Sequence, residues 1–291
     1  IKGVGNTMTA ISTLISAGGG GGGGSFPTIF LSSSQTWVPP MDGNICIHVI
    51  GAGGTGASAS SGHPGSGGAG SYARSTNWAV TTADSYTVVI GAGGADKIGG
   101  GHSEHRGGTS QFYNASNSIN MNCPGGYGGL ANGYNQQTTV AYASGGTHAN
   151  NAGGPGKMYW GQYAGGGAVG INASGVSGNF DIGKAGFGGE CDVVGELWSS
   201  SLGNLAGGVR GKGWYSPVAP GSHAGLMAGT DGGPLSGGGH CQGTTHTTST
   251  YMRGGDGGIG AGGGGALNYA SGGGAIGGKG GEGIVVIQYI P

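Results

Sequence analysis

The chain has 291 residues, 80 of them glycine, and a formal net charge of −1 at pH 7. Only 7% of its residues are charged and no Lys or Arg cluster occurs, so we expect no nucleic acid partner, because phosphate binding requires grouped basic side chains. No apolar run approaches the roughly 20 residues of a membrane span, and the start has no signal-peptide pattern. We therefore expect no membrane insertion.

Glycine at this level indicates either a flexible coil or a structure whose contacts leave no room for a Cβ atom. Hydrophobic residues make up 35% of the chain, and five Trp and twelve Tyr are spread along it. This composition favours order, since disordered chains have few aromatic residues and a high net charge. Glycine does not occupy every third position, which excludes a collagen triple helix.

Residues 1–24 differ from the rest of the chain. Apolar residues near the start recur at spacings of three and four, at Val4, Met8, Ile11 and Leu14. This spacing predicts an amphipathic helix over residues 1–17, and the glycine run 18–24 would form a linker. Because so short an apolar stripe is not stable alone, we expect this segment to bind its own domain or another subunit of an assembly.

Short runs rich in Val, Ile and Tyr and bounded by Gly or Pro predict strands between residues 25 and 114. They are TIFLSSSQTWVPP, NICIHVI, SYARSTNWAV, SYTVVI and TSQFYN, and GIVVIQYI closes the chain. In NICIHVI, Ile45, Ile47 and Val49 alternate and share one face. We expect the first and last strands to pair, so that both chain ends build one small β-sandwich framework.

Glycine clusters recur without a fixed period between about residues 99 and 283, as in GGYGG, AGGPG and GGDGGIGAGGGG. We predict rods of extended, three-residue-per-turn polyglycine II helices joined by loops of variable length. Such helices have no internal hydrogen bonds, so their backbone groups must bond neighbouring helices. Glycine then occupies the contact faces, and Ala, Ser and the occasional Ile or Val should point outward or toward a sheet.

The stretch Gly51–Gly56 fits the dinucleotide-binding pattern G-x-G-x-x-G. A dinucleotide site also requires a following helix and an acidic residue about 20 positions later. The sequence ASASSGHPGSGGAGS that follows is hostile to helix, and the next acidic residue is Asp84. The same VIGAGG recurs at Val89–Gly94. We therefore interpret both copies as junctions between a strand and a glycine rod.

No pattern in the sequence predicts an enzyme, a metal site or a cofactor. The groups His102, Glu104, His105 and His240, Cys241, His246 lack a recognised zinc-ligand spacing. No nucleophile elbow of the form G-x-S-x-G occurs. The four cysteines form no C-x-x-C pair, and both free thiols and one or two disulfides remain open.

Aromatic residues lie among Gly, Asn, Ser and Thr in the inserts between glycine clusters. This is the composition of antibody-type binding loops, although the same rings could instead plug the ends of the glycine stack. The candidate recognition residues are Tyr134, Tyr142, Tyr159, Trp160, Tyr163, Trp198, Trp214, Tyr215 and Tyr251.

From SSSQTWVPP through NICIHVIGAGGTG and SYTVVIGAGG to GGKGGEGIVVIQY, the chain resembles the glycine-rich domain at the ends of bacteriophage tail-fibre proteins. It is also similar to the distal adhesins of T-even-type phages. The resemblance implies layered polyglycine II helices whose connecting loops bind the host receptor, a cell-surface glycan or an outer-membrane protein. The N-terminal segment matches no attachment domain of that family.

We thus expect an all-β or irregular fold with residues 1–24 as an attachment segment and 25–291 as one glycine-rich domain. Its β-framework would comprise 25–114 and 283–291, and its rods and loops 99–283. The expected function is a non-enzymatic tail-fibre adhesin, in a virion or outside the cell, within a homo-oligomer or larger assembly. The alternatives are a structural virion decoration or filament subunit that assembles through residues 1–17, and an ice-binding protein.

Overall fold

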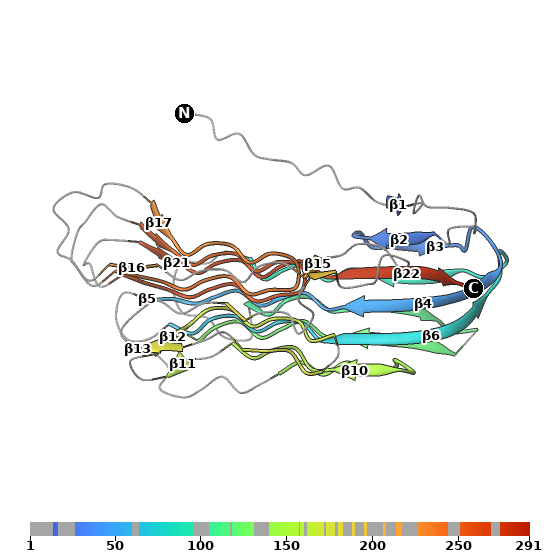
Figure 1. The fold of residues 1–291 in the computed structure, drawn as a ribbon, viewed down its shortest axis with the longest axis horizontal. Helices are drawn as coiled ribbons and strands as arrows, with labels where there is room; N and C mark the ends of the chain where they lie inside the picture. The colour runs from blue at the N-terminus through green and yellow to red at the C-terminus, as the bar shows by residue number, and fades with distance from the viewer. Residues whose placement is uncertain are drawn as a thin grey trace, which may run out of the picture.

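The computed structural model describes residues 14–16, 27–59, 64–95, 105–116, 118–130, 140–156, 158–159, 162–171, 173–177, 180–182, 188–189, 195–196, 206–207, 214–216, 226–243, 251–268 and 274–291. This described part is all-β and contains no α-helix. A β-sandwich occupies one end of the long axis, and a group of short strands occupies the other (Figure 1). Glycine-rich segments run lengthwise between the two groups (Figure 1).

The larger sheet of the sandwich has the strand order β1-β2-β22-β4-β6-β10. Its strands are β1 (Leu14–Ser16), β2 (Thr28–Leu31), β4 (Gly43–Ile50), β6 (Tyr72–Val80), β10 (Ala149–Asn151) and β22 (Ile284–Ile290). All neighbouring pairs are antiparallel. In β4 the predicted alternation is confirmed, since Ile45, Ile47 and Val49 are fully buried in the core between the sheets.

The second sheet of the sandwich is antiparallel, with the order β3-β7-β8-β9. Its strands are β3 (Gln35–Trp37), β7 (Tyr86–Val89), β8 (Ser110–Asn114) and β9 (Ile119–Cys123). The run TIFLSSSQTWVPP, predicted as one extended segment, supplies β2 to the first sheet and β3 to the second. The chain crosses between the sheets through residues 32–34.

The two ends of the domain pair as predicted. Thr28 of β2 lies opposite Gln288 of β22, and Leu31 lies opposite Val285. Strand β22 lies between β2 and β4, so the last strand of the chain completes the larger sheet. The sheet cannot form from the N-terminal part alone, because β2 reaches β4 only through β22.

The helix predicted over residues 1–17 is wrong at its C-terminal end. Leu14–Ser16 form β1, in which Leu14 pairs with Phe30 and Ser16 with Thr28. Strand pairing wins here because the edge of β2 offers a row of backbone donors and acceptors, whereas one short helical stripe buries too little. Val4, Met8 and Ile11 lie outside the described residues.

The core between the two sheets is aromatic on the side of the smaller sheet. The rings of Tyr86 and Phe112 stack with centroids 4.8 Å apart, and Trp37 lies 5.6 Å from Tyr86. Opposite them are aliphatic residues of β4 and β22, among them Ile47 and Ile287. Large rings supply the buried apolar area that a chain with 80 glycines otherwise lacks.

Residues 51–57, which follow β4 directly, donate their backbone N–H groups with a period of three. The acceptors lie in three antiparallel segments at 2.8–3.1 Å: Ser71, Gly68 and Gly65 for Gly51, Gly54 and Ala57; Gly108 and His105 for Ala52 and Thr55; Gly281 and Gly278 for Gly53 and Gly56. An ordinary β-strand sends its hydrogen bonds to two sides. This segment sends them to three.

The carbonyl groups of the same segment accept from three further segments. Gly126 and Gly129 donate to Ala52 and Thr55, Gly263 and Ala266 donate to Gly54 and Ala57, and Gly94 donates to Gly53. Segment 51–57 is therefore surrounded by six neighbouring segments. Three of them accept hydrogen bonds from its N–H groups, and three donate hydrogen bonds to its carbonyl groups. Its backbone groups are satisfied by lateral hydrogen bonds to other segments.

Glycine is required where these segments touch. A Cβ atom on Gly53, Gly54 or Gly56 would overlap with a backbone carbonyl of a neighbouring segment. Ala and Ser are expected to point outward or toward a sheet; Ala52 and Ser66, which lie within the stack, are fully buried. Small side chains therefore also fill the spaces between segments, because a methyl or hydroxymethyl group matches the gap left by close packing.

At both VIGAGG copies a strand is followed directly by a glycine-rich segment. Strand β4 continues into segment 51–57 and β7 continues into segment 90–95, without an intervening helix. The glycines of the G-x-G-x-x-G pattern are bonded to neighbouring segments. They serve lateral packing of the backbone.

Turns between glycine-rich segments pack on the outer face of the larger sheet. Val169, Ile171 and Leu235 form a buried cluster with residues of that sheet, including Ile50 and Val286. Leu235 is fully buried and has a φ of 62°, a conformation unusual for a residue with a side chain. These apolar turns fix the glycine-rich stack lengthwise against the sandwich.

Short strands close the opposite end of the molecule. Two sheets are parallel, β16-β18-β20-β5 and β17-β19-β21, and a third, β11-β12-β13, is antiparallel. The strands are β5 (Ser58–Ala59), β11 (Met158–Tyr159), β12 (Gln162–Ala164), β13 (Phe180–Ile182), β16 (Trp214–Ser216), β17 (Leu226–Ala228), β18 (Cys241–Gly243), β19 (Tyr251–Arg253), β20 (Ala266–Asn268) and β21 (Ala275–Ile276). A separate antiparallel pair consists of β14 (Gly195–Glu196) and β15 (Ala206–Gly207).

Candidate functional site

The end of the molecule opposite the sandwich, called here the distal end, consists of strands β5, β11–β13 and β16–β21 (Figure 1). Its two parallel sheets touch through β18, β19 and β20. Between them lies a small buried cluster of Cys241, Met252, Ala266 and Ala275. The thiol of Cys241 donates to Sδ of Met252 at 3.8 Å. Small side chains let the sheets approach closely, so the distal end continues the tight packing of the glycine-rich segments.

Several of the predicted recognition residues lie in strands of the distal end. They are Tyr159 in β11, Tyr163 in β12, Trp214 and Tyr215 in β16, and Tyr251 in β19. The backbone register pairs Trp214 with Cys241 and Tyr251 with Leu226. The sequence therefore grouped aromatic residues whose backbones the fold brings to one end, although their inserts are far apart along the chain.

Tyr142 does not belong to that group. It forms an isolated bridge with Ala152, next to β10 of the sandwich, and its side chain is 70% exposed. Tyr134, Trp160 and Trp198 lie outside the described residues.

The two ends of the glycine-rich segments are connected in different ways. Toward the sandwich, the turn at Pro234 and Leu235 has the side chain of Leu235 buried against the larger sheet. At the distal end, residues 217–225 connect β16 to β17, 244–250 connect β18 to β19, and 269–273 connect β20 to β21. None of these three connections contains Asp, Glu, Lys or Arg. The chain therefore joins these pairs of distal strands through uncharged stretches of five to nine residues.

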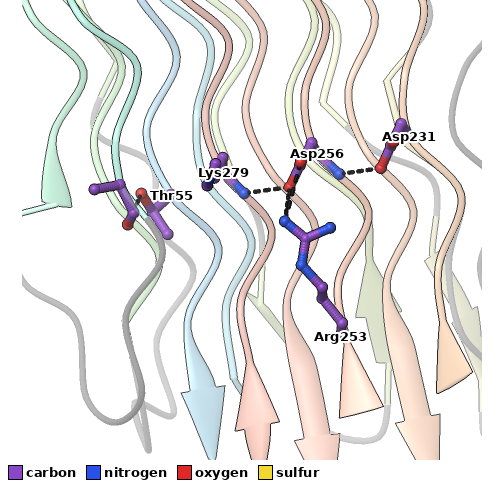
Figure 2. A network of polar contacts seen from close by, with 6 residues as sticks. Thr55, Asp231, Arg253, Asp256 and Lys279 are labelled. Carbon is purple, nitrogen blue, oxygen red and sulfur yellow. Dashed lines mark hydrogen bonds and ion pairs between the residues drawn. The ribbon is translucent and has the colours of Figure 1, made fainter. Parts of the chain in front are cut away.

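A ladder of polar contacts crosses three parallel glycine-rich segments (Figure 2). Asp231 accepts a hydrogen bond from the backbone N–H of Asp256 at 2.7 Å, and the carboxylate of Asp256 accepts one from the backbone N–H of Lys279 at 2.7 Å. Nη2 of Arg253 also donates to both carboxylate oxygens of Asp256, at 2.8 and 3.0 Å. This ladder was not predicted from the sequence, although Asp231, Asp256 and Lys279 each stand directly before two glycines, in TDGG, GDGG and GKGG.

A second polar group lies within the larger sheet of the sandwich, on the face opposite Ile45 and Ile47. His48 is 1% exposed. Its Nδ1 lies 2.8 Å from the hydroxyl of Tyr72, and its Nε2 lies 3.1 Å from Oε1 of Gln288 and 3.3 Å from Sγ of Cys46. A neutral ring with its proton on Nε2 satisfies both the amide and the phenol. The alternation in NICIHVI placed Cys46 and His48 on one face, but gave no sign that this face is buried.

Burial keeps this group uncharged. It lowers the pKa of His48 to about 3, against the opposing effect of the bond to Gln288, and raises the pKa of Cys46 to about 11. An activated thiol requires a lowered pKa. Cys46 and His48 are therefore a neutral, structural pair, and they do not resemble a cysteine–histidine catalytic dyad.

The histidine groups noted in the sequence lie only partly within the described residues. His105, His240 and Cys241 are buried, whereas His102, Glu104 and His246 lie outside the described part. Among described residues, no three His, Cys, Asp or Glu side chains are grouped closely enough to hold a metal ion. The described cysteines Cys46, Cys123 and Cys241 are free thiols.

The described fold is that of an all-β domain in which glycine-rich extended segments are held between a sandwich and a distal group of strands. No helix in the described part is long and apolar enough to cross a bilayer. A family model described as a glycine-rich domain matches residues 28–290, and the chain belongs to this family. The match begins with β2 and ends with β22, the two strands that close the sandwich. No curated protein matches the chain.

Proposed function

We propose that this protein is the receptor-binding tip of a bacteriophage tail fibre or a related phage-like particle. Its target would be a glycan or an outer-membrane protein of the host surface, bound without catalysis or cofactor. Two considerations support this: the resemblance of the sequence to tail-fibre glycine-rich domains, and the division of the molecule into two unlike ends.

The observation that carries the proposal is this polarity. The start of β2 and the end of β22 meet in one pair, Thr28 opposite Gln288, at the sandwich end (Figure 1). Strands bearing Trp214, Tyr215 and Tyr251 lie at the distal end. A fibre tip needs such an arrangement, because the end joined to the particle must be kept away from the end that meets the cell. A purely structural subunit does not need it.

The glycine-rich segments would supply the rigidity that a receptor-binding tip needs. We assign them to polyglycine II helices, which have three residues per turn. The threefold alternation of donors in segment 51–57 and its six bonded neighbours support this assignment. A laterally bonded stack is ordered before binding, so little conformational entropy would be lost in ordering it when a receptor binds. Aromatic side chains on such a platform offer large contact area at low entropic cost.

Adsorption of the fluorescently labelled full chain to a panel of bacterial strains tests the proposal. Trp214→Ala and Tyr215→Ala each remove one ring from β16, and Tyr142→Ala is the matched control because it removes an exposed ring beside the sandwich. Truncation of a central aromatic contact costs about 2 kcal/mol or more. We expect at least about tenfold weaker adsorption for a distal variant. The control variant should adsorb as strongly as the wild type.

If the wild-type chain adsorbs to no strain, or if all three variants adsorb like the wild type, the distal end is not the recognition surface. The second candidate, a structural decoration or filament subunit, then takes precedence. It is favoured by β1, which adds residues 14–16 to the edge of the sandwich outside the family match. Deletion of residues 1–16 should abolish assembly in that case, and should leave adsorption intact if the protein is an adhesin.

A further inference from the structure

The glycine-rich segments in the layer of the polar ladder lack a described neighbour on one side. Residues 254–258 show this most clearly, since their N–H groups again alternate with a period of three. Gly254 and Gly257 donate to Ile276 and Lys279, and Gly255 and Gly258 donate to Gly239 and Ser236. The backbone N–H of Asp256 points in the third direction. Its N–H meets no carbonyl of another segment and donates to the carboxylate of Asp231.

The neighbouring segment 278–283 repeats the arrangement. Gly278 and Gly281 donate to Gly264 and Ala261, and Gly280 and Gly283 donate to Gly94 and Gly91. In the third direction the N–H of Lys279 donates to the carboxylate of Asp256. In two adjacent segments, therefore, the third N–H donates to a side-chain carboxylate. In an interior segment such as 51–57, the corresponding N–H donates to a backbone carbonyl of a neighbouring segment.

The register of the parallel strands sets up this exchange. Ala228, Arg253 and Ile276 are register partners in β17, β19 and β21. One three-residue turn further along each segment come Asp231, Asp256 and Lys279. Each aspartate thus stands level with the N–H on the adjacent segment that faces away from the stack, and a short carboxylate side chain spans the distance between them.

Open backbone donors in a row are a template for another chain. This is the known hazard of an edge strand in a β-sheet, which proteins avoid with charged side chains and covered donors. In a stack of glycine-rich segments the same hazard arises wherever an N–H group that faces away from the stack has no acceptor. The glycine-rich segments of a second copy have the geometry to add to such a row.

We propose that Asp231 and Asp256 terminate the glycine-rich stack: their carboxylates accept from the outward N–H groups of Asp256 and Lys279 and thereby prevent a glycine-rich segment of a second copy from adding at this point. Asp231 is the better residue with which to test this role, because the carboxylate of Asp256 also accepts hydrogen bonds from Arg253. Asp231 is exposed and Asp256 is partly exposed, and both lie along the glycine-rich segments, so the device limits lateral association and leaves the distal end unaffected.

Hydrogen exchange of the full chain, measured by NMR, tests the capping step. In Asp231→Ala the amide of Asp256 loses its acceptor and should exchange at least about tenfold faster than in the wild type, since bonds to charged acceptors are the stronger ones. Asp231→Asn retains an oxygen at the same position and should preserve most of the protection. An unchanged exchange rate in Asp231→Ala, or equal loss in both variants, would overturn the proposal.

Sedimentation velocity over a concentration series tests the consequence. Asp231→Ala should form larger species as its concentration rises, relative to the wild type at equal concentrations. Asp42→Ala is the matched control, because it also removes one negative charge and uncovers one backbone N–H, that of Thr82, in the sandwich. Asp231→Asn makes the same change in net charge. Association in either control, or its absence in Asp231→Ala, would show that the carboxylate does not block addition of a second copy.

Discussion

The hydroxyl of Tyr72 lies 2.8 Å from Nδ1 of His48 within the larger sheet of the sandwich. Burial lowers the pKa of His48, and the positive charge of Arg74 disfavours its protonation further. A buried ring with a pKa of about 3 must stay neutral while the protein is folded. The unfolded chain has no such constraint and binds a proton at the ordinary histidine pKa of about 6.5.

The first prediction follows from this difference. Because the folded-state pKa of His48 is below the unfolded value, stability is unaffected above pH 6.5 and falls as pH decreases from about 6.5 toward about 3. The full loss is on the order of 5 kcal/mol. Denaturant melts at several pH values should show a shallower acid loss in His48→Gln. The control His148→Gln, at an exposed position, should retain the wild-type loss, and a His48→Gln profile parallel to the wild type would contradict the prediction.

The second prediction concerns glycine inside the stack. Gly56→Ala places a Cβ against the backbone of Gly264, which cannot rotate away. We expect a cost above the roughly 1–3 kcal/mol of ordinary overpacking, seen as loss of folded protein or a large fall in melting temperature. Gly65→Ala is the milder partner, since its Cβ would lie 3.2 Å from the nearest atom, the N of Leu130. Equal stability of the two variants would argue against close backbone packing.

The third prediction concerns Leu235, which is fully buried with a φ of 62°. Leu235→Ala loses the apolar contacts of the side chain and keeps the backbone strain, at a cost of about 2–5 kcal/mol. Leu235→Gly loses the same contacts and relieves the strain. Glycine is therefore expected to be the more stable of the two by about 1 kcal/mol. Chemical denaturation of both variants decides this, and the ordinary order of alanine above glycine would contradict it.

The fourth prediction concerns the free thiols. Burial raises the pKa of Cys46 to about 11 and of Cys241 to about 12, and it raises the pKa of Cys123 as well. Since the thiolate is the reactive form, these three residues should resist alkylation at pH 8 in the native protein and react on unfolding. Peptide mapping after labelling measures each site. Rapid native labelling of Cys123, which is fully buried, would show that the sandwich opens.

Much of the sandwich was predictable from local pattern. The alternation in NICIHVI and the apolar run GIVVIQYI predicted β4 and β22, because a strand with a buried face shows a period of two over its own length. The helix prediction failed at residues 14–16 because it, too, used only a local pattern. Spacings of three and four around Leu14 predict a helix, but the open edge of β2 is a tertiary feature that no local window contains.

For the candidate site, the sequence predicted the kind of residue involved and did not predict where those residues lie in the fold. The composition of the inserts indicated aromatic recognition residues, but not that β16 and β19 would end up at the distal end while Tyr142 lies beside the sandwich. The stretches TDGG, GDGG and GKGG are alike in the sequence, but their contact could not be predicted, because Asp231, Asp256 and Lys279 are 25 and 23 positions apart along the chain. Their alignment depends on the register of parallel segments.

Composition and short-range periodicity were enough to predict that this chain is ordered around glycine, that its first and last strands pair, and that its contacts exclude Cβ atoms. Which segments are neighbours, which small side chains are buried and which donors face outward became known from the folded arrangement. Glycine has no side chain with which to specify a partner. The choice among near-identical segments is therefore made by the strands, turns and aspartates at their ends and edges.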